Sequence, residues 1–248
     1  MTKGGYLRWR SHPHSARDEQ DTDLIRRIAD IQAANRQTYG SPRVHAALRH
    51  QGVAVSRKRV ARLMRKAGLN PEMPRIRITT TDSDHDSPIA DNVIDRDFTA
   101  PEPNQKWVTD ITYIRTDEGW LYLSAILDPY ARKVVGWAMD QTMGAALITK
   151  SLDMALANRR PAQGLIHHST ISMSRRGDCH DNACAESFWA RLKVELVYRQ
   201  RFATRDAARQ SIFATIETFY NRTRIHSAIG NVTPQAYEDA YYASFDAA

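Results

Sequence analysis

The chain has 248 residues, of which 42% are hydrophobic and 25% are charged, and it carries a formal net charge of +7. These values are typical of a soluble globular protein with one large domain or two modest ones. The longest apolar stretch, around residues 121–127, suits a buried strand and is too short to span a membrane. No apolar signal segment follows Met1, and two cysteines make no disulfide framework, so we expect a cytoplasmic protein.

The positive charge lies in one N-terminal block. Residues 1–70 carry 15 Lys and Arg against 5 Asp and Glu, residues 71–100 carry 3 against 7, and residues 101–248 carry 17 against 16. A basic block of this kind favours a polyanionic partner such as DNA or RNA. A solvated surface explains the same charge, so composition alone leaves both interpretations open.

Three short helices are expected near the N-terminus. Apolar residues at helical spacing predict the first helix over residues 24–35. Ser41 suits the N-cap of a second helix, with Pro42 at its first position. Ser56 suits the N-cap of a third helix, and Gly68 ends it.

The third helix carries six cations within ten residues, and they lie on its outer face. A plain helical bundle with a charged surface is the alternative, but this density favours a helix-turn-helix DNA-binding domain over residues 1–69. The expected DNA contacts on this helix are Arg57, Lys58, Arg59, Arg62, Arg65 and Lys66.

Residues 70–103 contain five prolines and a polar, acidic stretch, which indicates a linker. Residues 104–248 then show three strands joined by tight turns, a helix, a fourth strand and further helices, which together indicate an α/β domain of the ribonuclease-H type. The strands are expected over residues 107–114, 119–127, 133–139 and 164–169, and the helices over 142–158 with Thr142 as cap, 183–197 with Asp181 or Asn182 as cap, 206–220, and from Pro234.

Four segments, in their order along the chain, resemble signatures of the insertion-sequence transposases, the DDE recombinases related to retroviral integrases. The resemblance covers nearly the whole chain and implies the second-frame product of a two-frame bacterial element. It also implies a protein that binds double-stranded DNA as a homo-multimer, associates with the nucleoid, cuts element ends and joins 3′-hydroxyl groups to target DNA. The segments are Tyr39-Gly40-Ser41-Pro42-Arg43-Val44, Trp107-Val108-Thr109-Asp110-Ile111-Thr112-Tyr113-Ile114, Asp181-Asn182-Ala183-Cys184-Ala185-Glu186-Ser187-Phe188, and Phe219-Tyr220-Asn221-Arg222 with His226-Ser227-Ala228.

The chemistry of such a family requires oxygen ligands for two divalent ions, Mg²⁺ or Mn²⁺, which activate the attacking oxygen and stabilise the leaving one. The resemblance implies that Asp110 and Glu186 are the first and third of three catalytic carboxylates and ligate these ions. Lys193, two turns after Glu186, would contact the DNA end, and Arg43 would join the helix-turn-helix contacts. The structural alternatives are a solvated strand Asp, a Glu that complements a helix dipole, and a surface lysine.

The second aspartate of the family is absent. In relatives it follows the serine after two histidines, whereas here His167, His168 and Ser169 are followed by Thr170. About 20 residues of the family pattern are missing, as an in-frame deletion would leave. Because a parallel strand pair needs a crossover of about a dozen residues or more, residues 170–174 are not expected to form a separate fifth strand.

Catalysis by this copy is therefore expected to be impaired. The alternative to an enzyme is a DNA-binding remnant or a dominant-negative regulator of transposition. A different nuclease of the same fold is disfavoured by the signature around Asn221 and His226. Asp178 or Asp181 could replace the missing carboxylate, although helix capping is the simpler role for them.

Two further observations concern isolated residues. Cys179, His180 and Cys184 match no usual zinc spacing and lack an evident fourth ligand, so packing is the favoured role of the cysteines. Tyr6, Trp9 and Arg10 resemble a stretch that lies well inside longer relatives, which predicts a truncated start.

Overall fold

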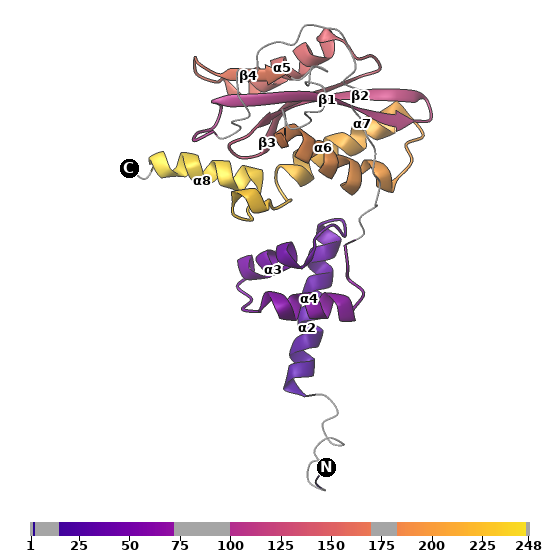
Figure 1. The fold of residues 1–248 in the computed structure, drawn as a ribbon, viewed down its shortest axis with the longest axis vertical. Coiled ribbons are helices and arrows are strands. Elements are labelled where there is room, and N and C mark those ends of the chain that lie inside the picture. The colour runs from indigo at the N-terminus through magenta and orange to yellow at the C-terminus, as the bar shows by residue number, and fades with distance from the viewer. Residues whose placement is uncertain (1, 3–14, 72–99, 170–182, 247–248) are drawn as a thin grey trace. The chain divides into compact units, whose positions relative to one another are not determined.

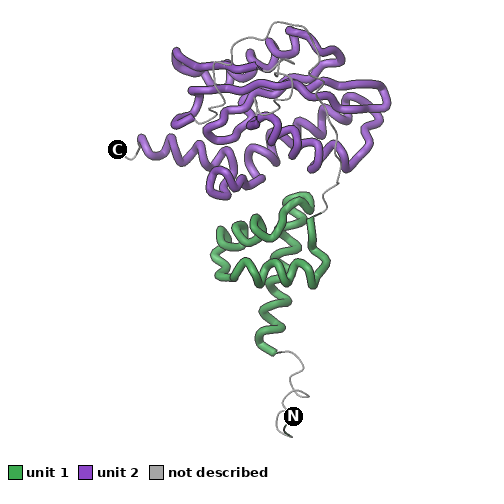
Figure 2. Tube along the Cα trace, viewed as in Figure 1, with its two compact units in different colours: residues 1–73 green, residues 74–248 purple. Residues whose placement is uncertain are grey.

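The computed structural model describes residues 2, 15–71, 100–169 and 183–246 (Figure 1). The chain divides into two compact units, residues 1–73 and 74–248 (Figure 2). Most of the expected linker, residues 72–99, lies outside the described residues, so the proposed domain boundaries stay predictions.

The described part of the first unit contains three helices, α2 (Ala16–Ala34), α3 (Ser41–His50) and α4 (Arg57–Lys66). The prediction that the first helix starts at Leu24 is wrong, because a capping box starts it earlier. The Ser15 hydroxyl accepts from the Asp18 amide at 3.2 Å, and the Asp18 carboxylate accepts from the Ser15 amide at 3.0 Å. These two reciprocal bonds form the capping box that starts the helix.

The caps of the next two helices differ from each other. Gly40, not Ser41, is the N-cap of α3, so the predicted cap is instead the first helical residue. The prediction for α4 is confirmed, because the Ser56 hydroxyl accepts from the Arg59 amide at 3.2 Å. Gly68 follows α4 with a φ of +68°, a conformation that glycine adopts without strain. The buried apolar residues of this unit are Leu24, Ile28, Ile31, Tyr39, Val44, Leu48, Val60, Leu63 and Met64.

The described part of the second unit contains a sheet of four strands in the order β3-β2-β1-β4. The predicted antiparallel meander is confirmed, and β4 lies parallel to β1 on its other side. Asp110 pairs with Ala125 of β2, while Ser169, the last residue of β4, pairs with Thr109. The strands are β1 (Lys106–Thr116), β2 (Gly119–Asp128), β3 (Lys133–Asp140) and β4 (Ile166–Ser169).

Helices cover both faces of this sheet (Figure 1). α5 packs on one face, where Ala155 meets Trp107, Ile126 and Val135. α6 and α7 pack on the other face, which buries the larger apolar cluster. This mixed sheet between helices is the ribonuclease-H-like arrangement that the sequence predicts. The helices of this unit are α5 (Ala145–Arg159), α6 (Ala183–Glu195), α7 (Arg205–Ala214) and α8 (Pro234–Asp246), with short 3₁₀ turns at Val197–Arg199 and Ser227–Ile229.

Three predicted helix limits need correction. Gly144, not Thr142, is the N-cap of α5. α6 ends at Glu195, two residues before the predicted end. The single helix predicted over residues 206–220 is α7 followed by a π-helical segment, Thr215–Tyr220, and the Thr204 side chain caps α7.

Some expectations fall on residues outside the described ranges. These are the fate of residues 170–174 and the capping roles of Asp181 and Asn182. Within the described residues, no helix is both long and apolar enough to cross a membrane.

Candidate functional site

Asp110 lies in the middle of β1, on the face that α6 covers. The indole Nε1 of Trp189 donates to its Oδ2 at 2.9 Å, and the backbone amide of Ile111 donates to its Oδ1 at 2.7 Å. Both carboxylate oxygens are therefore held in place by donors from two different elements. These bonds fix the orientation of Asp110 before any ligand arrives.

The electrostatic surroundings of Asp110 connect it to two residues of α6. Burial, helped by the nearby Glu186 carboxylate, raises the pKa of Asp110 to about 6, although the Ile111 amide, Trp189 and Lys193 oppose the rise. Burial lowers the pKa of Lys193, and Asp110 opposes that change. The structure thus brings Asp110, Glu186 and Lys193 within electrostatic reach of one another.

One helical face presents the α6 residues to β1. Glu186, Trp189 and Lys193 are spaced by three and four residues, so they lie along one side of the helix. Glu186 is exposed in the first turn, whereas Trp189 is 6% exposed against the sheet. The neighbouring stripe of α6, with Ala185, Phe188 and Leu192, packs beside Trp189 in the apolar cluster.

The C-terminal end of α6 is fixed by a buried ion pair. Both carboxylate oxygens of Glu195 accept from the Arg224 guanidinium, from Nε and Nη2, at 2.8 Å each. The two side chains are 3% and 1% exposed. Arg224 lies between the two parts of the C-terminal signature that the sequence singles out, so this segment positions the helix bearing Glu186.

Asn221 of the same signature holds the edge of the sheet. Its side-chain oxygen accepts from the Val134 amide at 3.0 Å, and its side-chain nitrogen donates to the Val134 carbonyl at 2.9 Å. Asn221 thus occupies the position of a neighbouring strand on β3. The role of this segment in the described structure is architectural.

The two histidines of β4 lie beside β1. Nε2 of His167 lies 2.6 Å from the Thr109 hydroxyl, and the residue pairs with Trp107 in the sheet. Burial, followed by the charge of His168, lowers the pKa of His167. The lowered pKa favours a neutral imidazole in this position.

The described donor set does not fit a pair of hard divalent ions. Among the described residues, no three His, Cys, Asp or Glu side chains gather where they could hold a metal ion. Asp110 and Glu186 alone provide too few oxygen ligands for two Mg²⁺ or Mn²⁺ ions. Asp178 and Asp181, the possible substitutes, lie outside the described residues.

Asp128 does not complete this set, because it belongs to another cluster. It accepts from the amides of Asn104 at 2.7 Å and Tyr130 at 3.0 Å, and Arg159 lies 3.6 Å away. Burial raises the pKa of Asp128 to about 6. Its bond to the Tyr130 amide places it at the start of the turn that follows β2.

Cys184 is a packing residue, as the sequence favours. It is 3% exposed within the apolar cluster, and burial raises the pKa of its thiol to about 11. Zinc binds the thiolate, so this environment opposes a zinc site. Cys179 and His180 lie outside the described residues.

In the first unit, the six cations of α4 divide into two groups. Arg59 and Arg62 both bind Asp21 of α2, through Nε at 2.8 Å and Nη2 at 2.6 Å respectively. Hydrogen bonds from Arg62 and Arg59 lower the pKa of Asp21, whose side chain is 8% exposed. These two arginines attach α4 to α2; Arg62 is nonetheless exposed, as expected of all six cations, whereas Arg59 is half-buried. The remaining four, all exposed and without an ion pair in the described part of the chain, are Arg57, Lys58, Arg65 and Lys66.

Other site residues have different surroundings. The Arg43 guanidinium lies 5.7 Å from the centre of the Tyr39 ring, and the Lys193 ammonium lies 5.4 Å from that of Tyr113. Such distances allow a cation–π contact.

The sequence analysis did not predict the roles of Trp189 and Asp21. The spacing of Trp189 from Glu186 and Lys193 was nevertheless a signal that could have identified it.

Comparisons with known proteins match both units. Residues 17–77 match the HTH-like domain family, and residues 100–170 and 167–234 match two integrase core domain families. The insertion element IS600 uncharacterized 31 kDa protein of Shigella sonnei is 40% identical, with 98% of this chain and 96% of that protein aligned. The transposase InsF for insertion sequence IS3A of Escherichia coli strain K12 is 39% identical, over 83% of this chain and 78% of its own length.

Both alignments contain positions that have no counterpart in this chain. The first spans 262 positions, and 98% of 248 residues is about 243, which leaves about 19. The second spans 225 positions, and 83% of 248 residues is about 206, which leaves about 19. The two integrase core matches meet at residues 167–170.

Proposed function

Because the chain belongs to the integrase-core transposases of bacterial insertion elements, we propose that it binds element-end DNA but is impaired in metal-dependent strand cleavage and strand transfer. The observation that carries this proposal is that Asp110 and Glu186 lie near each other while no third metal-binding side chain joins them among the described residues. The expected pair of Mg²⁺ or Mn²⁺ ions would activate the attacking oxygen and stabilise the leaving group. Two carboxylates provide too few ligands to hold both ions.

The helices of the first unit support the DNA-binding part of the proposal. In a helix-turn-helix domain, the later helix lies in the major groove and flanking cations contact phosphates. α4 offers Arg57, Lys58, Arg65 and Lys66, which are exposed and available for such contacts. Asp21, Arg59 and Arg62 keep this helix in place on α2. Arg43 in α3 and Lys193 in the core are the further contacts that we propose.

The length of chain between β4 and α6 supports the impairment. Residues 170–182, 13 in number, separate Ser169 from Ala183. A crossover to a parallel strand takes about a dozen residues or more, before the strand itself is counted. The number of unmatched positions in each alignment is close to the number of residues, about 20, by which the chain falls short of the family pattern. These counts favour a deletion that removed the second aspartate together with a crossover helix and the fifth strand.

A cleavage assay tests the impairment. The full chain is incubated with duplex DNA that carries the ends of its element, with Mg²⁺ and then with Mn²⁺, and strand cleavage is compared with that of Asp110→Ala and Glu186→Ala. We expect all three proteins to bind the duplex and none to cut it. Cleavage by the unaltered chain that both substitutions abolish would restore a complete catalytic site and contradict the proposal.

A mixing experiment tests the consequence for transposition. A protein that occupies element ends without cutting them would act as a dominant-negative regulator, provided that it joins homo-multimers of active relatives. Adding this chain to an active relative is expected to reduce cleavage by that relative. An unchanged rate, at a concentration where this chain occupies the DNA, would contradict the regulatory role and leave a DNA-binding remnant.

A further inference from the structure

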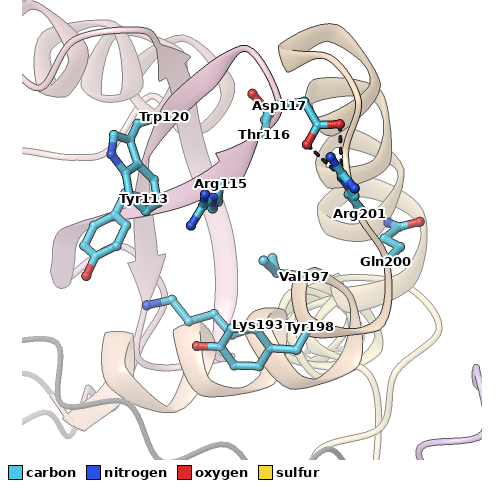
Figure 3. A pocket seen from close by; sticks show the side chains of 10 residues that line it. All are labelled: Tyr113, Arg115, Thr116, Asp117, Trp120, Lys193, Val197, Tyr198, Gln200 and Arg201. Carbon is cyan, nitrogen blue, oxygen red and sulfur yellow. Dashed lines mark hydrogen bonds and ion pairs between the residues drawn. The ribbon is translucent and has the colours of Figure 1, made fainter.

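A cavity of about 560 Å³ lies in the second unit, hereafter the core unit, between the β1–β2 hairpin and the end of α6 (Figure 3). Its volume falls within the range of about 300–1,000 Å³ that small-molecule-sized sites occupy. Figure 3 shows aromatic and cationic side chains around the space, with hairpin residues on one side and residues of α6 and the following 3₁₀ turn on the other. The lining includes Tyr113, Arg115, Trp120, Lys193, Tyr198 and Arg201.

The hairpin presents an exposed aromatic pair to this cavity. Tyr113 is 41% exposed and Trp120 is 46% exposed, and their rings meet edge to face with centres 5.1 Å apart. Each ring therefore keeps a large part of its surface open to a ligand. Tyr198 adds a third ring from the opposite side. Exposed aromatic surface that is grouped in a hollow indicates a binding site more than a scattered surface residue does.

The charge around the cavity is positive. Arg201 pairs with Asp117 at 2.8 Å, so these two charges balance each other. Arg115, opposite Trp120 in the hairpin, makes no ion pair within the described residues. Lys193 adds a second cation and lies near the ring of Tyr113. Two cations in excess beside three aromatic rings suit a ligand that has both flat, stackable groups and negative charge.

We propose that this cavity binds an unpaired nucleotide of a DNA strand, with its base against Tyr113 and Trp120 and its phosphate near Arg115 and Lys193. The inference rests on the proposed DNA-binding function and adds a site for single-stranded DNA. Bases within a duplex stack on each other and expose no ring face, whereas an unpaired base does. Because Lys193 also acts electrostatically on Asp110, the bound nucleotide lies next to the candidate catalytic residues.

Duplex DNA with and without a single-stranded thymidine tail tests this site. The dissociation constants of the full chain for a tailed and a blunt duplex of equal total length are measured at the same salt concentration. We expect tighter binding of the tailed DNA, and we expect Trp120→Ala to weaken binding of that DNA by about five-fold or more. Trp120→Phe keeps a ring and should retain most of the preference. Tyr242→Ala removes a ring with the same exposure, 46%, from α8 outside the cavity, and should change nothing.

A second measurement locates the tail without any substitution. Thymidine in the tail is replaced by 5-iodouridine, which crosslinks to stacked aromatic side chains under ultraviolet light, and the modified peptides are identified by mass spectrometry. Crosslinks at Tyr113, Trp120 or Tyr198 are expected. Equal binding of tailed and blunt DNA, or crosslinks elsewhere, would overturn this site while leaving DNA binding intact. Failure to bind either DNA would overturn both the site and the proposed function.

Discussion

The two ends of α6 place a glutamate in opposite surroundings. Near the N-terminal end, Glu186 is exposed and lies within electrostatic reach of Asp110, whose pKa burial raises to about 6. At the C-terminal end, Glu195 is buried and accepts two bonds from Arg224. At one end, Glu186 opposes the ionisation of the nearby Asp110, while at the other end the charge of Glu195 is matched by that of Arg224.

This difference separates the framework of the site from its chemistry. The contacts that hold α6 against the sheet are complete in the described residues, including the Glu195–Arg224 pair and the packing of Phe188 and Leu192. Among the described residues, the candidate site has fewer carboxylates than a pair of metal ions needs. In this part of the chain, the framework that presents Glu186 therefore does not depend on a complete set of metal ligands.

Removing the charge of Glu195 is expected to have the largest effect on the free energy of unfolding. Glu195→Gln leaves the buried Arg224 guanidinium without its anionic partner, and breaking a buried ion pair in this way costs about 3–5 kcal/mol. The free energy of unfolding of the core unit, from urea denaturation, should fall by that amount. Asp206→Asn breaks the pair with Arg209 at the start of α7, where the aspartate is 81% exposed, and should cost less than about 0.5 kcal/mol. Equal losses for the two variants would contradict the comparison.

Sequence patterns predicted the elements and the residues that lie close along one helix or strand. The strand meander, the three N-terminal helices and the spacing of Glu186 and Lys193 all follow from short-range periodicity. Periodicity identifies a buried face but not the partner that meets it. Asp21 accepts from Arg59 and Arg62, which lie 38 and 41 positions away, and Asp110 accepts from Trp189, which lies 79 positions away. Such pairs depend on how the elements pack, so the sequence alone did not predict them.

Neutralising Asp110 should change the free energy of unfolding by less than Glu195→Gln does, and should raise it rather than lower it. Unfolded aspartate titrates near pH 4, whereas burial raises the pKa of Asp110 to about 6 in the folded chain. The folded state then binds the proton more tightly, so Asp110 makes stability fall as the pH rises from about 4 to about 6. Asp110→Asn should be more stable than the unaltered chain by about 2–3 kcal/mol near pH 7, and nearly equal to it below about pH 4.

The control for this prediction is a carboxylate whose pKa shifts the other way. Lys150 lowers the pKa of Asp140, which therefore stabilises the fold at neutral pH and loses that contribution as the pH falls. Asp140→Asn should reduce stability near pH 7. Melting temperatures of both variants across this pH range provide the measurement, and a destabilised Asp110→Asn at neutral pH would show that its two hydrogen bonds outweigh its burial.

α4 also carries both a cation that is paired with a carboxylate and a cation that is exposed for contact with DNA. Substitutions of these two cations are expected to have the smallest effects. Arg57 makes no ion pair in the described residues, whereas Arg59 binds the buried Asp21 carboxylate. Arg57→Ala should lower the slope of log affinity for duplex DNA against log salt concentration by about 0.9, the value for one lost phosphate contact, without changing the melting temperature. Arg59→Ala should lower the melting temperature of the first unit, because Asp21 loses one of its two partners. If Arg59→Ala instead changed the salt slope and left the melting temperature unchanged, Arg59 would be a phosphate contact and the division within α4 would not hold.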